Sequence, residues 1–218
     1  MKVNKTLYIL LMLLPLVITL AALPYLPDQV PGHYNIHNQV DRWGSKYEML
    51  ITPAITIVFG LGMLPIARLA GKQEGEGENN YKITLFTSML CMGLFTAMTL
   101  YFLYAAFIRT QDLDTLEVSM DSLLWLLMGG FLILSGNIMP KAKKNSFLGL
   151  RTTWSMSSDV AWKKSQRFGG ISAILCGAAM ILVSLVLRGM LCTLLCLMLL
   201  VAMVVLDVVY SYHAAKNP

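Results

Sequence analysis

Charged side chains divide this chain into six long uncharged stretches. Each has 18 to 26 residues without Asp, Glu, Lys or Arg and is rich in Leu, Val, Ile and Met. A helix of about 20 apolar residues crosses the roughly 30 Å hydrocarbon core of a bilayer, so every stretch is long enough to span a membrane. A membrane β-barrel would instead show segments of alternating polarity. We expect helices near residues 6–23, 51–69, 83–107, 122–138, 168–187 and 190–211.

Composition supports the same fold class. Of the 218 residues, 56% are hydrophobic and only 13% are charged, whereas about one-quarter of an ordinary soluble domain is charged. The pattern therefore predicts an all-α integral membrane protein with six transmembrane helices. The first stretch follows Lys2 and Lys5, as the apolar part of a signal peptide would. Its length and the poor cleavage site at residues 19–21 favour an uncleaved first span.

Lys and Arg are distributed unequally between the two predicted sides. If the amino terminus is cytoplasmic, 13 of these 17 residues lie on the cytoplasmic side, and the other four are Arg42, Lys46, Arg109 and Arg188. Short cytoplasmic loops carry an excess of positive charge, so both termini are expected to face the cytoplasm. Topology also explains the net charge of +5, and nothing indicates direct nucleic-acid binding.

The expected spans organise the chain into three parts. Residues 1–70 contain two spans and the outer loop 24–50, residues 71–121 a linker, the third span and an acidic outer connection, and residues 122–218 three spans and the cytoplasmic loop 139–167.

Neither long loop has enough residues to bury a hydrophobic core of its own. Each is therefore expected to be structured by packing against the helices. The Gly- and Glu-rich residues 71–80 favour a flexible linker. The acidic residues of 109–121 fit either a solvated connection or attraction for a cationic peptide.

The outer loop contains a candidate metal site. His33, His37 and Asp41 recur at every fourth residue, which on a helix would align three possible ligands. Pro31 disfavours a helix there, and the pattern lacks the glutamate of the zinc-protease motif. The alternative is a polar, hydrogen-bonded cap on the helices. We expect no bound metal and no other cofactor.

Reactive or ionisable side chains also occur at two places inside the predicted spans. Cys192 and Cys196 share a helix face but have no His nearby in the sequence, which favours helix contact over metal binding. Asp207 lies near the cytoplasmic end of the last span, either as a partner for Arg151, as a proton site, or as a carboxylate that reaches interfacial water. No nucleophile, base and oxyanion site converge at one depth, so we expect no enzyme.

The cytoplasmic loop combines basic residues with uncharged polar ones. Ser157 and Ser158 are placed to cap a helix that begins near Val160 and continues into the fifth span. That helix is expected to place Trp162 at the membrane interface and its basic residues at lipid phosphates. Lipid binding does not explain the remaining polar residues, which predict a network that folds the loop beneath the helices: Asn137, Asn145, Arg151 and Thr152.

The motifs in both loops resemble a known family. The cytoplasmic loop has Gly-Asn-x-x-Pro-Lys at 136–141, then Asn145, Gly-x-Arg-Thr-x-Trp at 149–154 and Trp-Lys-x-x-x-Arg at 162–167. These motifs resemble the signature of the SdpI family of bacterial immunity proteins. Residues 26–35 and the later Asp41-Arg42-Trp43 and Lys46 resemble the extracytoplasmic module of the same proteins. Asn38 stands where Gly is expected, Thr153 where Pro is expected, and Gln166 where His is expected.

The resemblance implies a multi-pass protein of the bacterial plasma membrane that gives resistance to a secreted antimicrobial peptide. Its implied partners are membrane lipid, the peptide toxin and, in some members, a cytoplasmic transcriptional repressor held at the membrane. A small transporter that exports a toxic peptide or amphiphile is the alternative, and it would need broken helices and polar groups at mid-membrane. The expected toxin-sensing residues are Asp28, His33, Asn35, Asp41 and Arg42. The expected cytoplasmic signature residues are Asn137, Pro140, Lys141, Asn145, Gly149, Arg151, Thr152, Trp154, Trp162, Lys163 and Arg167.

Overall fold

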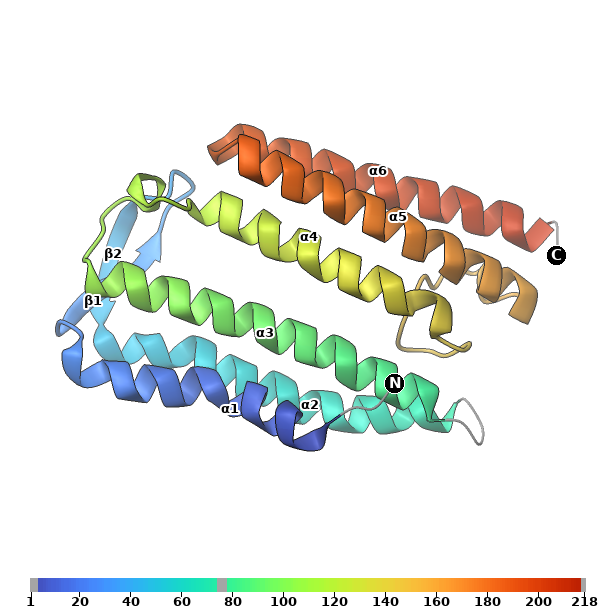
Figure 1. Cartoon of the computed structure of the whole chain (residues 1–218), viewed down its shortest axis with the longest axis horizontal. Coiled ribbons are helices and arrows are strands. Elements are labelled where there is room, and N and C mark those ends of the chain that lie inside the picture. Colours follow the sequence, from blue (N-terminus) through green and yellow to red (C-terminus); the bar gives the residue numbers. More distant parts are fainter. Residues whose placement is uncertain (1–3, 74–77, 217–218) are drawn as a thin grey trace. The chain divides into compact units, whose positions relative to one another are not determined.

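The computed structural model describes residues 4–73 and 78–216, and six long helices dominate this part of the chain (Figure 1). Each of the six is long and apolar enough to cross a membrane, which confirms the expected all-α membrane protein. Pro15 and Pro65 lie within the first two helices without interrupting them. The helices are α1 (Lys5–Ala22), α2 (Ile51–Lys72), α3 (Asn79–Phe107), α4 (Met120–Ile138), α5 (Asp159–Val186) and α6 (Gly189–Lys216).

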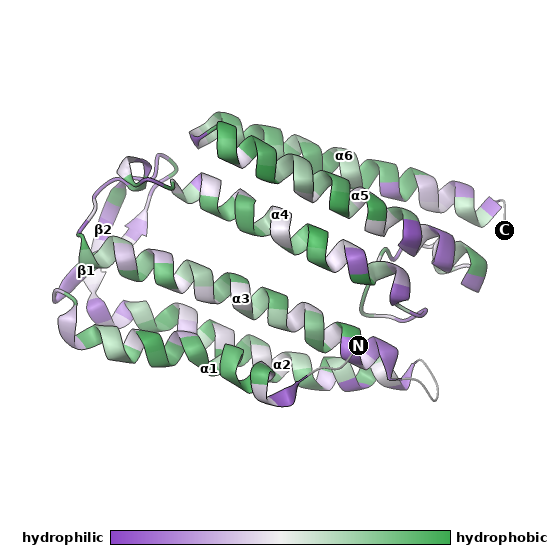
Figure 2. Cartoon of the chain, in the orientation of Figure 1, coloured by the Kyte–Doolittle hydropathy of each residue, from purple (hydrophilic) through white to green (hydrophobic). Residues whose placement is uncertain are grey.

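Several helices extend beyond the uncharged stretches that predicted them. In Figure 2 the helices are hydrophobic through most of their length, and hydrophilic residues occupy the loops and the first turns of α5. The interpretation of residues 71–80 as a flexible linker is wrong at both ends. The helix α2 continues to Lys72, and α3 begins at Asn79, with Asn80 completely buried. Residues 74–77 of that segment lie outside the described part.

The chain divides into two compact units. One unit comprises Pro65–Thr87 and Asp121–Pro218, and the other comprises Val3–Leu64 and Ser88–Met120. The outer loop belongs to the second unit, where Leu26 and Val30 pack against Leu103 of α3. The cytoplasmic loop belongs to the first unit. Each loop thus gains a hydrophobic core from the helices of its own unit, as expected for segments too short to form one alone.

Small residues bring α4 and α5 into backbone contact. A Cβ added at Gly129 would lie 2.6 Å from the carbonyl oxygen of Gly177, and one added at Gly136 would lie 2.6 Å from that of Gly170. A Cβ added at Gly170 or Gly177 would likewise collide with the carbonyl oxygen of the facing glycine, so neither helix tolerates a side chain at these contacts. Glycine contacts of this kind allow helices to pack closely within a bilayer.

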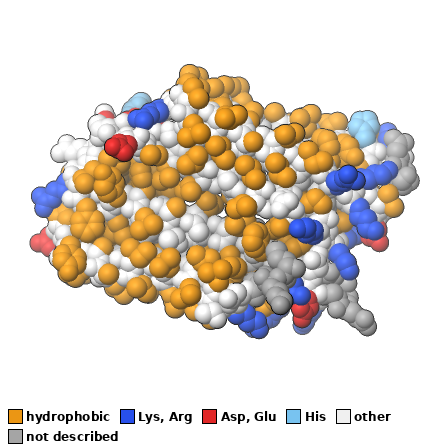
Figure 3. All heavy atoms as spheres, viewed as in Figure 1, with side chains coloured by type: hydrophobic (Ala, Val, Ile, Leu, Met, Phe, Trp, Pro, Cys, Tyr) orange, Lys and Arg blue, Asp and Glu red, His pale blue; other side chains and the backbone are white. Residues whose placement is uncertain are grey.

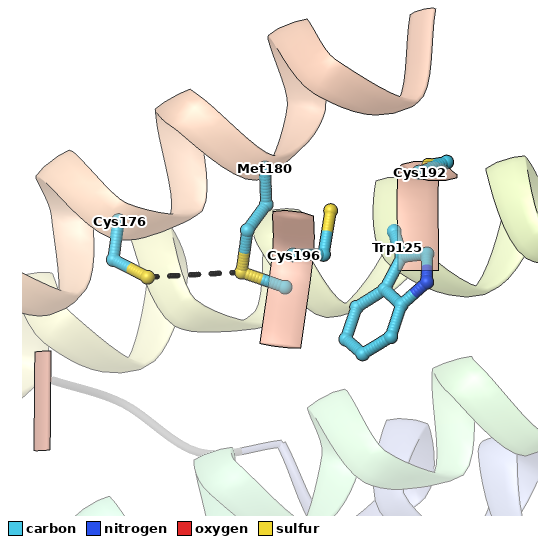
Figure 4. Close-up of a cluster of buried hydrophobic side chains, with 5 residues drawn as sticks. All are labelled: Trp125, Cys176, Met180, Cys192 and Cys196. Carbon is cyan, nitrogen blue, oxygen red and sulfur yellow. Dashed lines mark hydrogen bonds between the residues drawn. The ribbon is translucent and has the colours of Figure 1, made fainter. Parts of the chain in front are cut away.

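A sulfur-rich cluster lies between α4, α5 and α6 (Figure 4). Cys192 and Cys196 are completely buried and pack with Trp125 and Met180. The thiol of Cys176 lies 3.7 Å from the sulfur of Met180. All four cysteines are free thiols. Cys192 and Cys196 therefore serve the helix contact that their spacing indicated.

Surface chemistry follows the membrane assignment. In Figure 3 hydrophobic side chains cover most of the visible helical surface, and Lys and Arg side chains gather over the loop between α4 and α5. Exposed apolar residues include Val58 at 71%, Leu182 at 65% and Leu197 at 45% of their surface. In water such a surface would favour aggregation, whereas lipid tails cover it without cost.

The predicted orientation is tested by labelling single cysteines at His37 and Ser146, both exposed, after replacement of the native cysteines by alanine. A membrane-impermeant maleimide on intact cells should label His37→Cys and leave Ser146→Cys unlabelled until the membrane is opened. The reason is the concentration of Lys and Arg on the loop that contains Ser146. Labelling of both positions on intact cells would contradict this topology.

Candidate functional site

The outer loop folds into a β-hairpin, an element that the sequence analysis did not predict. Strand β1 (Gln29–Tyr34) pairs antiparallel with β2 (Val40–Ser45), between the short helices η1 (Leu23–Tyr25) and η2 (Lys46–Leu50). Pro31 is compatible with β1 because this two-stranded sheet consists only of edge strands. The helix that would have aligned the three candidate metal ligands is therefore absent. Within residues 4–73 and 78–216, no group of three or more His, Cys, Asp and Glu side chains is arranged to bind a metal.

Asparagine side chains shape the turn of the hairpin. The side-chain oxygen of Asn35 accepts hydrogen bonds from the backbone N–H groups of His37 at 2.8 Å and Gln39 at 3.1 Å. Asn38 has a φ of 57°, in the left-handed region. Glycine adopts that region most readily and asparagine tolerates it, which explains why Asn38 can stand where the family resemblance leads us to expect Gly.

The connection between α3 and α4 fastens this turn to the rest of its unit. The N–H of Val40 donates to the carbonyl of Gln111 at 2.8 Å, and the N–H of Leu113 donates to that of Asn38 at 2.9 Å. The side chain of Asn38 also donates to Asp114 at 2.9 Å. The acidic connection is thus a third, partly paired segment beside the hairpin.

Four of the five expected toxin-sensing residues form ion pairs or side-chain hydrogen bonds within the hairpin and its flanks. Asp28 pairs with Lys46 at 2.9 Å, and the hydrogen bond and charge of that ammonium lower the pKa of the Asp28 carboxyl. His33 Nδ1 lies 2.6 Å from Asp41 across the two strands. These exposed pairs contribute little individually, but together they fix the strands in one register.

The third pair is the most extensively bonded. The guanidinium of Arg42 contacts both carboxylate oxygens of Glu48, at 3.1 and 2.8 Å, and also donates to the carbonyl of Gly32 at 2.8 Å. The charge and hydrogen bonds of Glu48 raise the pKa of Arg42. Because Glu48 lies in η2, this pair joins the hairpin to the start of α2.

Beneath the hairpin lies a cavity of about 420 Å³. Its wall combines Tyr34 with Phe102, whose rings stack at a centroid distance of 6.3 Å, and the buried side chains of Leu103 and Leu113. Burial raises the pKa of Tyr34 to about 12, so this side chain is neutral at every physiological pH. The remaining lining residues are Pro31, Gly32, His33, Asn35, Asn38, Glu48, Met49, Ile51, Thr52, Thr99 and Met120.

In the cytoplasmic loop, side-chain amides bond the backbone N–H and C=O groups that regular secondary structure would otherwise pair with one another. The buried Asn145 accepts hydrogen bonds from the N–H groups of Phe147 and Leu148, both at 2.8 Å, and donates to the carbonyl of Lys143 at 2.7 Å. At the start of α3, Asn80 bonds both the N–H and the carbonyl of Lys143. Asn79 donates to the carbonyl of Lys141.

Gln166 holds the centre of the loop. Its side chain accepts from the N–H of Leu150 and donates to the carbonyl of the same residue, both at 2.9 Å, and it is completely buried. The adjacent Gly149 has a φ of 92°, and a Cβ there would lie 2.2 Å from the Gln166 side-chain oxygen. The family resemblance leads us to expect His at position 166, and in this chain the side-chain amide of Gln166 bonds both the N–H and the carbonyl of Leu150.

The next turn of the loop docks on the end of α6. The hydroxyl of Thr152 lies 2.8 Å from that of Ser211, and Ser155 donates to the carbonyl of Leu150 at 2.8 Å. Trp154 packs edge-on against Tyr212 at a centroid distance of 5.3 Å. The predicted polar network beneath the helices is therefore present around Asn145 and Thr152.

The helix expected from Val160 is confirmed, since Ser158 caps α5 by accepting from the N–H of Ala161 at 3.0 Å. The expectation for Trp162 is wrong. Its side chain is 2% exposed and its indole N–H donates to the carbonyl of Ala142 at 2.8 Å, so it anchors the loop from the inside. Lys163 and Arg167 on the same helix are exposed, as predicted.

Arg151 and Asp207 are not brought together. Arg151 is exposed, and it forms no ion pair with Asp159 or Asp207 anywhere in the described part of the chain. Asp207 is 6% exposed and accepts a hydrogen bond from Ser172 of α5 at 2.6 Å. Asn137, Pro140 and Lys141 are also exposed, so they lie outside the buried part of the network.

Several residues that organise the loop were not among the predicted site residues. Asn79 and Asn80 were assigned to a linker, and Gln166 was treated only as a departure from the family motif. The adjacent Asn79 and Asn80 before a long apolar stretch could have indicated this role, because asparagine often satisfies backbone groups at helix starts. The sequence gives no indication that Ser172 bonds Asp207 or that Ser211 contacts Thr152, because any serine in a span can bond its own helix.

The fold and the two organised loops define a class: a multi-pass membrane protein whose water-facing segments are folded onto its helices. Residues 141–211 match the SdpI/YfhL protein family, and residues 10–57 match the domain of unknown function DUF1648. Over 196 residues the chain is 26% identical to the Immunity protein SdpI of Bacillus subtilis (strain 168), an alignment that covers 88% of this chain and 86% of that protein.

No solved structure matches the chain. The two family matches and the long alignment confirm the resemblance to the SdpI family that the loop motifs indicated. Together with the six apolar helices, they place the chain among multi-pass proteins of the bacterial membrane.

The role of Gly149 is tested by Gly149→Ala. An alanine there would be strained at a φ of 92° and would collide with Gln166, so the free energy of unfolding should fall by about 1–3 kcal/mol. Gly130→Ala is the matched control, because a Cβ at Gly130 of α4 meets nothing within 4 Å. Thermal unfolding of the purified protein in detergent is the measurement. Equal stability of both variants would contradict the close packing of Gly149 against the Gln166 side chain.

Proposed function

We propose that this chain is an immunity protein that protects its own cell against a secreted antimicrobial peptide. The observation that carries the proposal is the alignment with an immunity protein over 88% of the chain, which includes both the outer module and the cytoplasmic loop. On this proposal the chain acts by binding, without catalysis.

The chemistry of the outer module fits such a partner. Six carboxylates and three cationic side chains lie between residues 24 and 120 on the predicted outer side. Clustered negative potential attracts cationic ligands and speeds their encounter with a surface. Many peptides that attack membranes are cationic and amphipathic. A secreted peptide would therefore meet an acidic surface before it reached the helices.

We further propose that the cytoplasmic loop signals the presence of the peptide by holding a transcriptional repressor at the membrane. Its exposed basic residues include Lys163 and Arg167, which alternate along α5 with the buried Trp162 and Gln166. The buried pair fixes the positions of the exposed pair. Fixed cations of this kind suit a partner with a complementary acidic surface.

Survival and repressor capture, measured on the same variants in a sensitive bacterium, test this division of roles. Asp41→Ala removes the partner of His33 and should abolish both, because both begin with the peptide outside. The double variant Lys163→Gln, Lys164→Gln should keep protection and lose toxin-dependent co-sedimentation of the repressor with membranes. No folded loop of this length reaches through the roughly 30 Å hydrocarbon core.

Three outcomes would count against parts of this account. If the unmodified chain gives no survival advantage, the immunity role is wrong. If the lysine variants lose survival together with co-sedimentation, the two roles are not separable. Protection that disappears when the proton gradient is collapsed would favour the transporter alternative.

A further inference from the structure

We propose that the cavity beneath the hairpin binds an aromatic or large aliphatic side chain of a cationic peptide. The inference rests on the proposed function, since the peptide is the one against which the chain protects. It adds a specific site and a ligand chemistry.

The volume suits one or two bulky side chains. The cavity encloses about 420 Å³, whereas a cavity of about 150 Å³ is enough to hold a benzene ring. Ligand sites in proteins usually measure from about 300 to 1,000 Å³. The cavity is therefore too small for a folded peptide and large enough for a single anchoring residue with part of its neighbour.

Its wall is apolar and aromatic. Leu103 is 4% exposed and Leu113 is 1% exposed, and both are held in place by the hydrophobic clusters beneath the hairpin. Phe102 and Tyr34 present stacked rings, a surface that favours another aromatic ring. Met49, with its flexible thioether, can adapt to side chains of different shape.

The rim is polar, and one carboxylate beside it lies outside the Arg42–Glu48 pair. Asn35, Asn38 and Glu48 line the cavity, the charge of Glu48 is paired with that of Arg42, and Asp114 is hydrogen-bonded to Asn38 beside the cavity. His33 on the rim has a side chain 62% exposed, so the cavity opens to the surface of the unit. An apolar recess beside a carboxylate complements a hydrophobic residue flanked by Lys or Arg.

The hairpin holds this cavity in shape before any ligand arrives. The Arg42–Glu48 contact joins β2 to the start of α2, and the backbone pairing of Gln39 with Asp112 joins the turn to the α3–α4 connection. Elements on every side of the cavity are therefore tied to one another. A preformed site loses less conformational entropy on binding, which raises affinity for a given contact area.

Thr99→Phe tests the site by filling it. Thr99 lines the cavity and is 3% exposed, and its hydroxyl donates within its own helix, to the carbonyl of Phe95 at 2.8 Å. Leu100→Phe is the matched control, because the neighbouring Leu100 does not line the cavity and is 48% exposed. Both variants place the same side chain on the same turn of α3.

The probe is a fluorescent synthetic amphipathic peptide with several lysines and one tryptophan, paired with a version that has alanine in place of tryptophan. Binding is measured by anisotropy on the full chain in zwitterionic phosphatidylcholine nanodiscs, with empty nanodiscs as the blank. The unmodified chain and Leu100→Phe should bind the tryptophan peptide alike. Thr99→Phe, or loss of the tryptophan, should weaken binding about tenfold, the value of one buried aromatic side chain.

The outcomes separate this inference from the proposed function. Equal binding by Thr99→Phe and Leu100→Phe, or no saturable binding by the unmodified chain, would overturn the cavity as a peptide site. Survival assays then show whether immunity itself persists, since the unmodified chain would still protect cells if another surface met the peptide. Thermal unfolding of both variants shows that each is folded, so that lost binding is not lost structure.

Discussion

Every buried peptide group in the water-facing segments needs a hydrogen-bond partner, and residues 142–158 of the cytoplasmic loop form no helix or strand that would supply one. In the cytoplasmic loop side-chain amides fill this need. Gln166 binds both polar groups of Leu150, and Asn145 and Asn80 bind the backbone around Lys143. An unpaired buried peptide group costs about 1–3 kcal/mol. Each of the three side chains accepts from at least one backbone N–H, so removing one of them leaves that N–H without its partner, and the loop depends on all three.

The same constraint is met differently on the predicted outer side. There a two-stranded hairpin pairs its own backbone, and ion pairs of Asp28, His33 and Arg42 hold its strands and flanks together. The ion pairs lie at the surface, whereas Leu26 and Val30 are buried against α3. The hairpin consequently has a solvated face that can meet a ligand and a buried face that encloses a cavity.

The number of helices and their class were predictable because they depend on where charges are absent, a property visible in the sequence alone. The capping of α5 by Ser158 was predictable for a similar reason, since capping is local. The hairpin was not, because the spacing of His33, His37 and Asp41 also fits a helix and no turn motif marked the pairing of residues 29–34 with residues 40–45. Trp162 was assigned to the membrane interface because sequence cannot show that Ala142 presents a carbonyl to its indole.

Amide hydrogen exchange of the purified protein tests most directly whether side-chain amides hold the cytoplasmic loop. The N–H groups of Lys143, Phe147, Leu148 and Leu150 should exchange slowly, because each donates to an amide side chain. The N–H of Thr153, which has no such partner in the described part of the chain, should exchange rapidly. Gln166→Ala should accelerate exchange at Leu150 while leaving Lys143 protected by Asn80. If all of these backbone N–H groups exchange as fast as that of Thr153 in the unmodified protein, the side chains of Asn80, Asn145 and Gln166 do not hold the loop.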